Sequence, residues 1–533
     1  IKQAQQQLYN TLSGGFSETL PPNLIQSIGL TDKNTAYRAI HFPENHQQLS
    51  AAQLRLKFEE LFYIQLQLLK KKQLRQQQIK GYVFEKVGTI FNTFFKQSLP
   101  FALTNAQKKV LKEIRQDLGT GIQMNRLLQG DVGSGKTIIA LMSMLIGVDN
   151  GFQACLMAPT EILAQQHFQS LSELLEGSEV RIALLTGSTK KADRTPLHDA
   201  LQTGELHILV GTHAVLEDKV QFANLGLAII DEQHRFGVAQ RAKLWKKNKL
   251  PPHVLVMTAT PIPRTLAMSL YGDLDVSIID ELPPGRKPVK TVWRKDSNRL
   301  KVFQFIKDEI KKGRQVYVVY PLIEESETLD YKDLMDGYES LQRSFPAPEY
   351  QISIVHGRMK PDAKEYEMQR FQKKQTQILI ATTVIEVGVN IPNASVMIIE
   401  SAERFGLSQL HQLRGRVGRG NAQSFCILMS GYKLSEESRT RLDTMVRTHD
   451  GFEIAEVDLR LRGPGDLMGT QQSGILQLNI ANLVKDQDVL ILARNWAEAL
   501  LEKDPHLQLP EHQGVKASFE ALTQNKALWK YIS

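Results

Sequence analysis

The residues with the most specific chemistry lie in one glycine-rich stretch, GDVGSGKT. It follows the apolar run NRLLQ and precedes TIIALMSMLIG, a helix-like segment. The spacing G-x-x-x-x-G-K-[ST] lets backbone N–H groups turn toward phosphate, with Lys136 contacting the β- and γ-phosphates and Thr137 ligating magnesium. A chance match in a turn is the alternative, which the strand-then-helix context disfavours. The loop residues are Gly130, Asp131, Val132, Gly133, Ser134, Gly135, Lys136 and Thr137.

Two carboxylates end a second apolar run, LAIIDEQH. A carboxylate at the carboxyl end of a parallel strand faces the ligand crevice. We expect Asp231 to hold magnesium, through water, and Glu232 to polarise the attacking water. Acidic residues often terminate strands, so this pair alone is weak evidence for a nucleotide site. The evidence becomes strong because the pair follows the glycine-rich loop within one alternating α/β segment.

A third group, QLHQLRGRVGRG, is rich in arginine. It contains Gln412, Arg414, Arg416 and Arg419, and arginines at i, i+3 can share a helical face. A γ-phosphate needs such donors, and an inserted arginine accelerates phosphoryl transfer roughly 10³–10⁵-fold. The alternative is a nucleic-acid or surface patch. Together with the other two elements, the segment favours Arg416 and Arg419 as catalytic residues and Gln412 as a nucleotide contact.

The composition is that of a globular protein of several domains. The chain has 533 residues, 42% hydrophobic, with a formal net charge of +8. The basic excess is compatible with a polyanionic partner, although many basic proteins bind no nucleic acid. Cys155 and Cys426 each lie in an apolar run, which predicts buried thiols and excludes a zinc or disulfide framework. No apolar run approaches membrane-spanning length, so no membrane partner is expected.

The pattern along the chain predicts elements that could position these residues. Residues 1–95 read as helical, with Leu54, Phe58, Leu61, Phe62 and Leu66 at helical spacing before a basic run at 70–72. Apolar runs then alternate with helical segments over 96–285 and again over 286–435, separated by the linker-like DELPPGRKPVKT. Residues 436–533 return to a helical pattern, interrupted by the glycine-rich RLRGPGDLMGTQQSG. The prediction is an α/β fold of two tandem lobes with parallel sheets, flanked by helical N- and C-terminal regions.

These motifs occur along the chain in the order typical of superfamily 2 helicases. Their sequences most resemble those of the RecG family of branch-migration enzymes. The resemblance implies two RecA-like P-loop lobes, use of ATP and Mg²⁺, and an ATP-dependent helicase that translocates on double-stranded DNA. It further implies remodelling of branched DNA, by stalled-fork reversal and Holliday junction migration, in recombination and repair. The motifs that carry it are GDVGSGKT, APTEILAQQH, TGSTKKADR, GTHAV, DEQHRFGVAQR, MTATPIPRTLA, HGRM, ATTVIEVGVNIPNA, QLHQLRGRVGRG, DGFEIAEVDLRLRGPGDLMGTQQSG, IHFPEN and LKFEELF.

The resemblance also implies roles for single residues, each of which has an ordinary turn, cap or surface role as its alternative. The adenine-side residues would be Phe101, Thr104 and Gln107. Thr258 and Thr260 would link hydrolysis to motion between lobes, and Thr382, Thr383, Glu386 and Gly388 would line the cleft from the second lobe. The DNA contacts would be Pro159, Thr160, Thr186, Gly187, Gly211, Thr212, His213, Thr382, Arg460, Arg462 and Gln471, with Gln472 beside them.

The family carries an N-terminal wedge, a small β-barrel, ahead of the helical part. Residues 1–95 show no strand pattern, so we expect a chain without the wedge and with impaired junction unwinding. The resemblance implies a monomer in the bacterial cytoplasm, nucleoid-associated, with single-strand-binding protein as a further partner. The alternative function is a transcription-repair coupling translocase acting on RNA polymerase, which shares the segment around Arg460. The sequence DEQH and the helical N-terminal region favour the RecG family over the transcription-repair coupling translocase.

Overall fold

The computed structural model describes residues 6–7, 9, 11, 15–232, 250–258, 263, 274–283, 287–321, 327–382, 391–418, 420, 422–466 and 478–524, without the side chains of 327–333, 361, 462–466 and 524. The chain forms two compact units. The helical unit comprises Ile1–Gln78, Pro263–Asp275 and Leu459–Ser533. The two-lobe unit comprises Ile79–Ile262 and Val276–Asp458.

The first lobe contains a seven-stranded sheet, in the order β3-β4-β2-β5-β6-β1-β7. The defined pairs among β1 to β6 all run parallel, and β1, β2, β4, β5 and β6 are buried along their whole length, as apolar runs predict. The strands are β1 (Asn125–Gly130), β2 (Gln153–Met157), β3 (Ile182–Leu185), β4 (Ile208–Gly211), β5 (Leu225–Asp231), β6 (His253–Thr258) and β7 (Asp275–Ile279).

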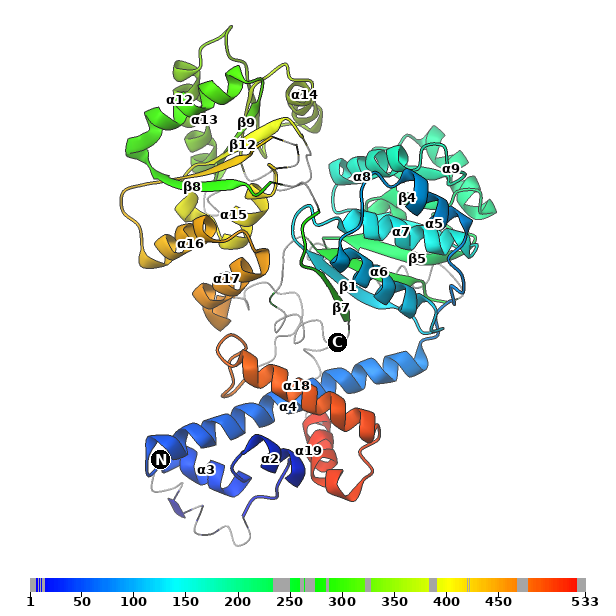
Figure 1. Ribbon diagram of the computed structural model, residues 1–533, viewed down its shortest axis with the longest axis vertical. Helices are drawn as coiled ribbons and strands as arrows, with labels where there is room; N and C mark the ends of the chain where they lie inside the picture. The colour runs from blue at the N-terminus through cyan, green and yellow to red at the C-terminus, as the bar shows by residue number, and fades with distance from the viewer. Residues whose placement is uncertain are drawn as a thin grey trace. The chain divides into compact units, whose positions relative to one another are not determined.

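Helices cover this sheet and bury its core. α6 and α7 lie side by side (Figure 1), and α7 is buried along most of its length against β1, β2 and β5. The helical segments are α5 (Thr89–Thr93), η1 (Phe94–Ser98), α6 (Asn105–Leu118), α7 (Lys136–Asp149), α8 (Glu161–Leu174), α9 (Lys191–Thr203) and η2 (His213–Leu216).

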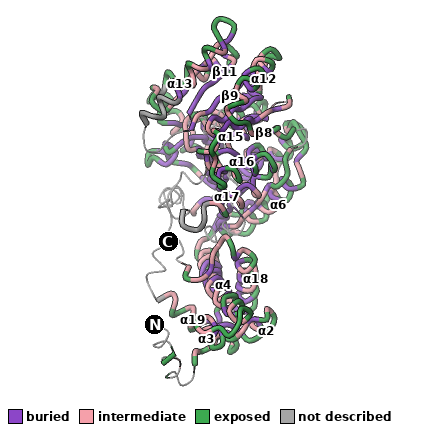
Figure 2. Tube along the Cα trace, turned by 90° about the vertical axis from the view of Figure 1, so that its left-hand side faces the viewer, coloured by how far each residue is buried: buried purple, intermediate pink, exposed green. Residues whose placement is uncertain are grey.

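The second lobe contains a six-stranded, wholly parallel sheet, in the order β10-β11-β9-β12-β13-β8. Figure 2 shows the buried strands in purple inside the lobe and exposed segments in green on its outside. The strands are β8 (Lys290–Lys295), β9 (Gln315–Tyr320), β10 (Ile352–Val355), β11 (Ile378–Thr382), β12 (Ala394–Ile399) and β13 (Phe425–Ser430). The helical segments are η4 (Asp296–Asn298), α12 (Arg299–Lys311), α13 (Glu327–Ser344), α14 (Pro361–Gln372), η6 (Ala402–Arg404), α15 (Leu407–Arg414) and α16 (Glu436–Arg447).

Two tandem parallel α/β lobes are confirmed, with one correction at the sheet edges. The sequence pattern predicted neither β7 nor β8, and β8 overlaps the end of the segment read as a linker. Both are outermost strands, so only one neighbour pairs with each. Their residues are only partly buried, which gives a mixed rather than a continuously apolar pattern.

The flanking regions are helical, as expected. In the helical unit, α4 (His46–Gln78) lies alongside α18 (Gln487–Lys503) (Figure 1). Phe58, Leu61, Phe62 and Leu66 of α4 are fully buried in a core that includes α18, whereas Leu54 is 39% exposed. The remaining elements are α2 (Pro22–Ile28), α3 (Lys33–His41), α17 (Gly451–Asp466), η7 (Pro510–His512) and α19 (Gln513–Gln524).

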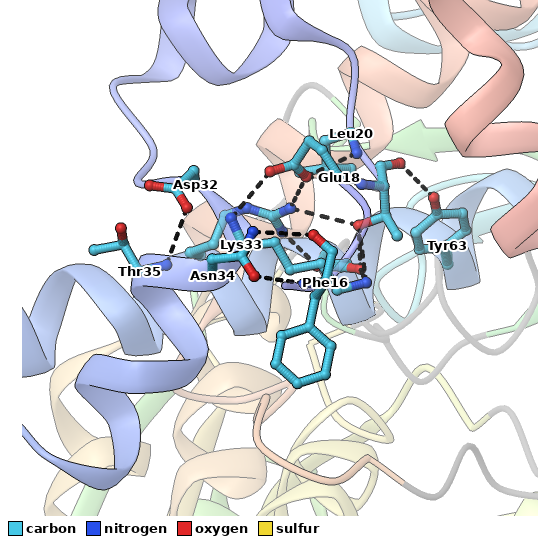
Figure 3. Close-up of polar contacts among 11 residues, drawn as sticks. Phe16, Glu18, Leu20, Asp32, Lys33, Asn34, Thr35 and Tyr63 are labelled. Atoms are coloured by element: carbon cyan, nitrogen blue, oxygen red, sulfur yellow. Dashed lines mark hydrogen bonds and ion pairs between the residues drawn. The ribbon is translucent and has the colours of Figure 1, made fainter. Parts of the chain in front are cut away.

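A buried cluster of charged side chains attaches the segment before α2 to α4. The guanidinium of Arg55, 0% exposed, pairs with the carboxylates of Glu18 and Glu59. Figure 3 shows the Glu18 carboxylate accepting backbone N–H groups from Leu20 and Lys33, and the Tyr63 hydroxyl donating to the carbonyl of Thr19. The basic run that follows is partly used in the fold, since Lys70 Nζ donates to Pro505 O at 2.7 Å.

Candidate nucleotide site and nucleic-acid loops

The glycine-rich loop has the geometry that its sequence predicts. It joins β1 to α7, and Gly133 and Gly135 have φ of 77° and 90°, which glycine adopts without strain. A Cβ at Gly135 would lie 2.3 Å from the Gln107 amide nitrogen, so no larger residue fits there. Lys136 Nζ donates to Gly130 O at 2.7 Å and to Asp131 O at 2.9 Å. Phosphate oxygens would compete with these two carbonyls for the same ammonium.

Thr104 and Gln107 bond to each other at the start of α6, so their polar groups are already used within the protein. The Thr104 hydroxyl accepts from Gln107 N, and Thr104 N donates to the Gln107 amide oxygen, which is a capping box. The amide nitrogen of Gln107, a residue 1% exposed, donates to Ser134 O at 2.8 Å. Gln107 therefore braces the glycine-rich loop, and a contact with adenine stays a prediction that requires exchange of these bonds. Phe101 is 41% exposed, as a ring available for stacking would be.

The strand-end carboxylates lie beside the loop. Asp231 ends β5, and its carboxylate oxygen is 2.8 Å from Nε2 of His167, on α8. Burial alone would raise the pKa of Asp231, but the hydrogen bond and charge of His167, with the charge of Lys136, lower it. Glu232 has φ of 54°, a left-handed conformation that is costly for a residue with a side chain and is typical of functional positions.

The residues predicted to hold magnesium are suited to it. Thr137 is the second residue of α7 and offers a hydroxyl, while Asp231 offers a carboxylate held in its ionised form. Magnesium takes a small number of such protein oxygens and completes its shell with phosphate oxygens and water. No cluster of three or more His, Cys, Asp or Glu with metal-site geometry occurs among the described residues.

The arginine-rich segment of the second lobe reaches the glycine-rich loop. His411 Nε2 lies 2.5 Å from Asp131 Oδ1. A Cβ on Gly415 would lie 2.7 Å from Val132, so the backbone after α15 packs directly on the loop. Gln412 and Arg416, which directly follow His411 and Gly415 in the chain, are half-buried. Arg419 lies outside the described residues.

Arg414 differs from the other arginines of this segment. Its guanidinium is buried and donates to the Met445 and Thr448 carbonyls at 2.9 and 2.8 Å. Burial lowers its pKa from the usual arginine value. These carbonyls belong to the C-terminal end of α16, where a cation is favourable because the helix dipole is negative there. Arg414 is thus an anchor within the lobe.

The loops predicted to meet the nucleic-acid backbone gather at the carboxyl ends of β2, β3 and β4. Thr160 caps α8, and the next residue, Glu161, accepts hydrogen bonds from the Ser188 backbone and hydroxyl. Thr212 N donates to Leu185 O, and a Cβ on Gly211 would lie 2.2 Å from that oxygen. The structure therefore brings together the set Pro159, Thr160, Thr186, Gly187, Gly211, Thr212 and His213.

Other predicted residues are placed singly. Thr258 and Thr382 end β6 and β11, and the buried Thr382 hydroxyl has no hydrogen-bond partner among the described residues. Arg460 is exposed on α17, which also contains Arg462. Thr260, Thr383, Glu386, Gly388, Gln471 and Gln472 lie outside the described residues.

Sequence reasoning missed two histidines. His167 and His411 lie in the motifs APTEILAQQH and QLHQLRGRVGRG, where no role was predicted for either. Each contacts a carboxylate of the nucleotide site from an element distant along the chain. Their presence within motifs, at the end of the first and near the start of the second, was the available signal. Separately, no described helix is long and apolar enough to cross a membrane.

Three family models match the chain in succession. The DEAD/DEAH box helicase model matches residues 104–269, and the helicase conserved C-terminal domain matches residues 300–421. The model for domain 3, C-terminal, of ATP-dependent DNA helicase RecG matches residues 448–533.

Similar proteins agree with these models. ATP-dependent DNA helicase RecG of Synechocystis sp. is 51% identical over 493 residues, 92% of this chain and 59% of the relative. The protein of the same name from Streptococcus pneumoniae is 48% identical over 513 residues, 93% of this chain and 75% of the relative. The chain thus spans about six tenths to three quarters of the length of these relatives.

A solved structure is also similar over most of the chain. The structure of RecG bound to a three-way DNA junction is 40% identical, with a TM-score of 0.70. The match covers 92% of this chain and 64% of that one. The ordered motifs, the paired parallel lobes and these identities have one consistent explanation, which is that the chain belongs to the RecG family of ATP-dependent DNA helicases.

Proposed function

We propose that this chain is an ATP-driven motor that translocates on double-stranded DNA and remodels branched DNA, by fork reversal and Holliday junction migration. One observation carries the proposal. A complete glycine-rich phosphate loop has the strand-end carboxylates on one side and the arginine-rich segment of a second lobe on the other. A relative 40% identical to this chain is described as bound to a three-way DNA junction.

ATP would bind at the glycine-rich loop. Lys136 exchanges its carbonyl partners for the β- and γ-phosphates, and Phe101 and Gln107 lie on the adenine side. Thr137 and Asp231 would hold Mg²⁺, which neutralises charge on the phosphates. Glu232 polarises the attacking water, and Arg416 and Arg419 stabilise charge that develops in the transition state. Gln412 and Gly388 complete the nucleotide contacts from the second lobe.

The loops at the carboxyl edge of β2, β3 and β4 would contact the phosphate backbone. Their small residues and hydroxyls suit close contact that does not read sequence. Thr382, Arg460, Arg462 and Gln471 would contact the duplex from the second lobe and the segment after it. Alternation of the lobes between nucleotide states then moves the chain along one duplex arm.

We further propose a setting for this activity. The chain acts as a monomer in the bacterial cytoplasm, associated with the nucleoid, and meets single-strand-binding protein at branched DNA. It divides into an N-terminal helical region (1–95), two RecA-like lobes (96–285 and 286–435) and a C-terminal translocation region (436–533). The basic excess of the chain, +8, suits the polyanionic substrate.

The test is the ATPase rate of the chain with forked, duplex and single-stranded DNA and with RNA, beside Lys136→Ala as the control. We expect stronger stimulation by forked and duplex DNA than by single-stranded DNA or RNA, and no hydrolysis by the variant. Because the ammonium is needed for phosphate binding and not for folding, the variant should keep the circular dichroism spectrum of the parent. Stronger stimulation by RNA, or wild-type turnover by a folded Lys136→Ala, would reject the assignment.

A further inference from the structure

The glycine-rich loop carries a carboxylate of its own, and the second lobe supplies its partner. Asp131 Oδ1 accepts from Val132 N at 2.7 Å and contacts His411 Nε2 at 2.5 Å. Asp131 belongs to the first lobe and His411 to α15 of the second, and both lie in the same compact unit. The contact therefore joins the lobes at the phosphate loop itself, separately from any contact through nucleotide.

The neighbours of His411 fix the hydrogen on its ring. Arg414 Nη2 lies 2.9 Å from His411 Nδ1, and a guanidinium can only donate. Nδ1 must therefore accept, so the ring hydrogen is on Nε2, which donates to the Asp131 carboxylate. The arrangement is directional, with Arg414 donating to His411 and His411 donating to Asp131.

The far end of this arrangement is rigid. Arg414 is buried and held by the Met445 and Thr448 carbonyls at the end of α16. Gly415 lies against Val132 with no room for a side chain, so the backbone is close to the loop at a second point. His411 has little freedom to move away from Asp131 without moving the whole end of α15.

A carboxylate beside the phosphate loop would repel polyphosphate unless its charge is satisfied. Burial alone would raise the pKa of Asp131, but the hydrogen bond from His411 and the charge of Lys136 lower it, so the group is ionised. An ionised Asp131 without its donor would compete with phosphate for Lys136, whose Nζ already lies on the Asp131 carbonyl.

We propose that Asp131 and His411 form a polar joint by which the second lobe holds the phosphate loop in its ATP-binding shape, with His411 as a positioning residue. The inference rests on the proposed function, because it concerns the same nucleotide site. Loss of His411 would release Asp131 toward the phosphates, which weakens ATP binding. Removing the charge of Asp131 would make the histidine dispensable.

The test is a double-mutant cycle on ATP binding and turnover without DNA. Variants are His411→Ala, Asp131→Asn and the double variant, with affinity measured by a fluorescent ATP analogue and KM by steady-state hydrolysis. We expect His411→Ala to weaken binding about 10-fold, which corresponds to about 1.4 kcal/mol. Asp131→Asn should weaken binding less than His411→Ala does, and the double variant should match Asp131→Asn. Because the residues are in contact, this non-additivity is the signature of the joint.

Two further variants make the result decisive. His411→Gln keeps an N–H donor and should restore most of the affinity, which also covers the case in which His411→Ala fails to fold. His512→Ala removes a buried histidine from an equivalent pair, with Asp504 at 2.8 Å in the helical unit, and should leave ATP affinity unchanged. Additive effects of the single changes, or equal losses in His411→Ala and His512→Ala, would overturn the joint. A wild-type chain that hydrolyses no ATP would instead overturn the proposed function.

Discussion

His253 should make the two-lobe unit lose stability at mildly acidic pH. It begins β6, is 0% exposed, and bridges two segments of the chain. Its Nδ1 accepts from Met124 N at 2.9 Å and its Nε2–H donates to Tyr82 O at 2.8 Å. Burial lowers the pKa of His253 from 6.5 to about 4, against a small opposite effect of the bond to Tyr82. A proton on Nδ1 would also break the contact with Met124.

The sign and size of the effect follow from this pKa. The folded chain binds the proton only near pH 4, whereas the unfolded chain binds it near pH 6.5. The stabilising contribution is therefore complete above pH ~6.5 and is lost as pH falls toward ~4. The difference between a pKa of 6.5 and one of about 4 corresponds to about 3 kcal/mol in full, of which about 2 kcal/mol is lost by pH ~5.

His253→Gln isolates this contribution because glutamine offers a donor and an acceptor but does not titrate here. We would measure urea unfolding of wild type and variant at pH ~7.5 and ~5, following tertiary structure of the two-lobe unit. The variant should be about 1 kcal/mol less stable at the higher pH, from imperfect hydrogen bonds. At the lower pH it should equal or exceed the wild type. Other titrating groups contribute equally to both proteins and cancel in the comparison. A difference in unfolding free energy between wild type and variant that does not change with pH would therefore refute the role of His253.

Three other changes have defined outcomes. Arg416→Ala should lower kcat far more than it weakens ATP binding, because the main interaction of Arg416 is with charge in the transition state. Single-turnover and binding assays measure the two effects, and equal losses in both would indicate a residue that only holds the ligand. Arg460→Ala should weaken binding to duplex DNA of any sequence. It should also reduce the slope of log affinity against log salt concentration by about 0.9. An unchanged slope in a salt titration would show that Arg460 does not contact DNA. Arg55→Ala should destabilise the helical unit by about 3–5 kcal/mol in thermal or urea unfolding, because it leaves Glu18 and Glu59 without their buried partner. Arg439→Ala, which breaks an exposed pair with Asp443 at 3.8 Å, is the control and should cost under about 1 kcal/mol.

The fold was predictable where a local pattern is sufficient. Apolar runs buried on both faces identified β1 and β9, and the glycine spacing identified the turn between β1 and α7. The outermost strands β7 and β8 were missed because polar and charged residues interrupt their apolar runs, whereas the outermost strands β3 and β10 are almost wholly apolar.

The candidate site was predictable only in part, for a related reason. Lys136 and Asp231 lie in motifs whose chemistry can be read from spacing. The pairs His167 with Asp231 and His411 with Asp131 join residues 64 and 280 positions apart, and no local pattern encodes such a contact. Gln107 was singled out, but the structure shows its amide bonded to Thr104 and Ser134, an arrangement that depends on how α6 packs on the loop.

The way α4 is held has a consequence for how the chain is made. One side chain of α4, Glu60, accepts the backbone N–H groups of residues 479–481, and another, Lys57, pairs with Asp486, 429 positions away. These partners are synthesised after the two lobes, so the apolar face of α4 stays uncovered while the lobes are made and fold. The helical unit then closes late, at the entropic cost of a very long loop, and until closure the uncovered face of α4 is a natural binding site for chaperones.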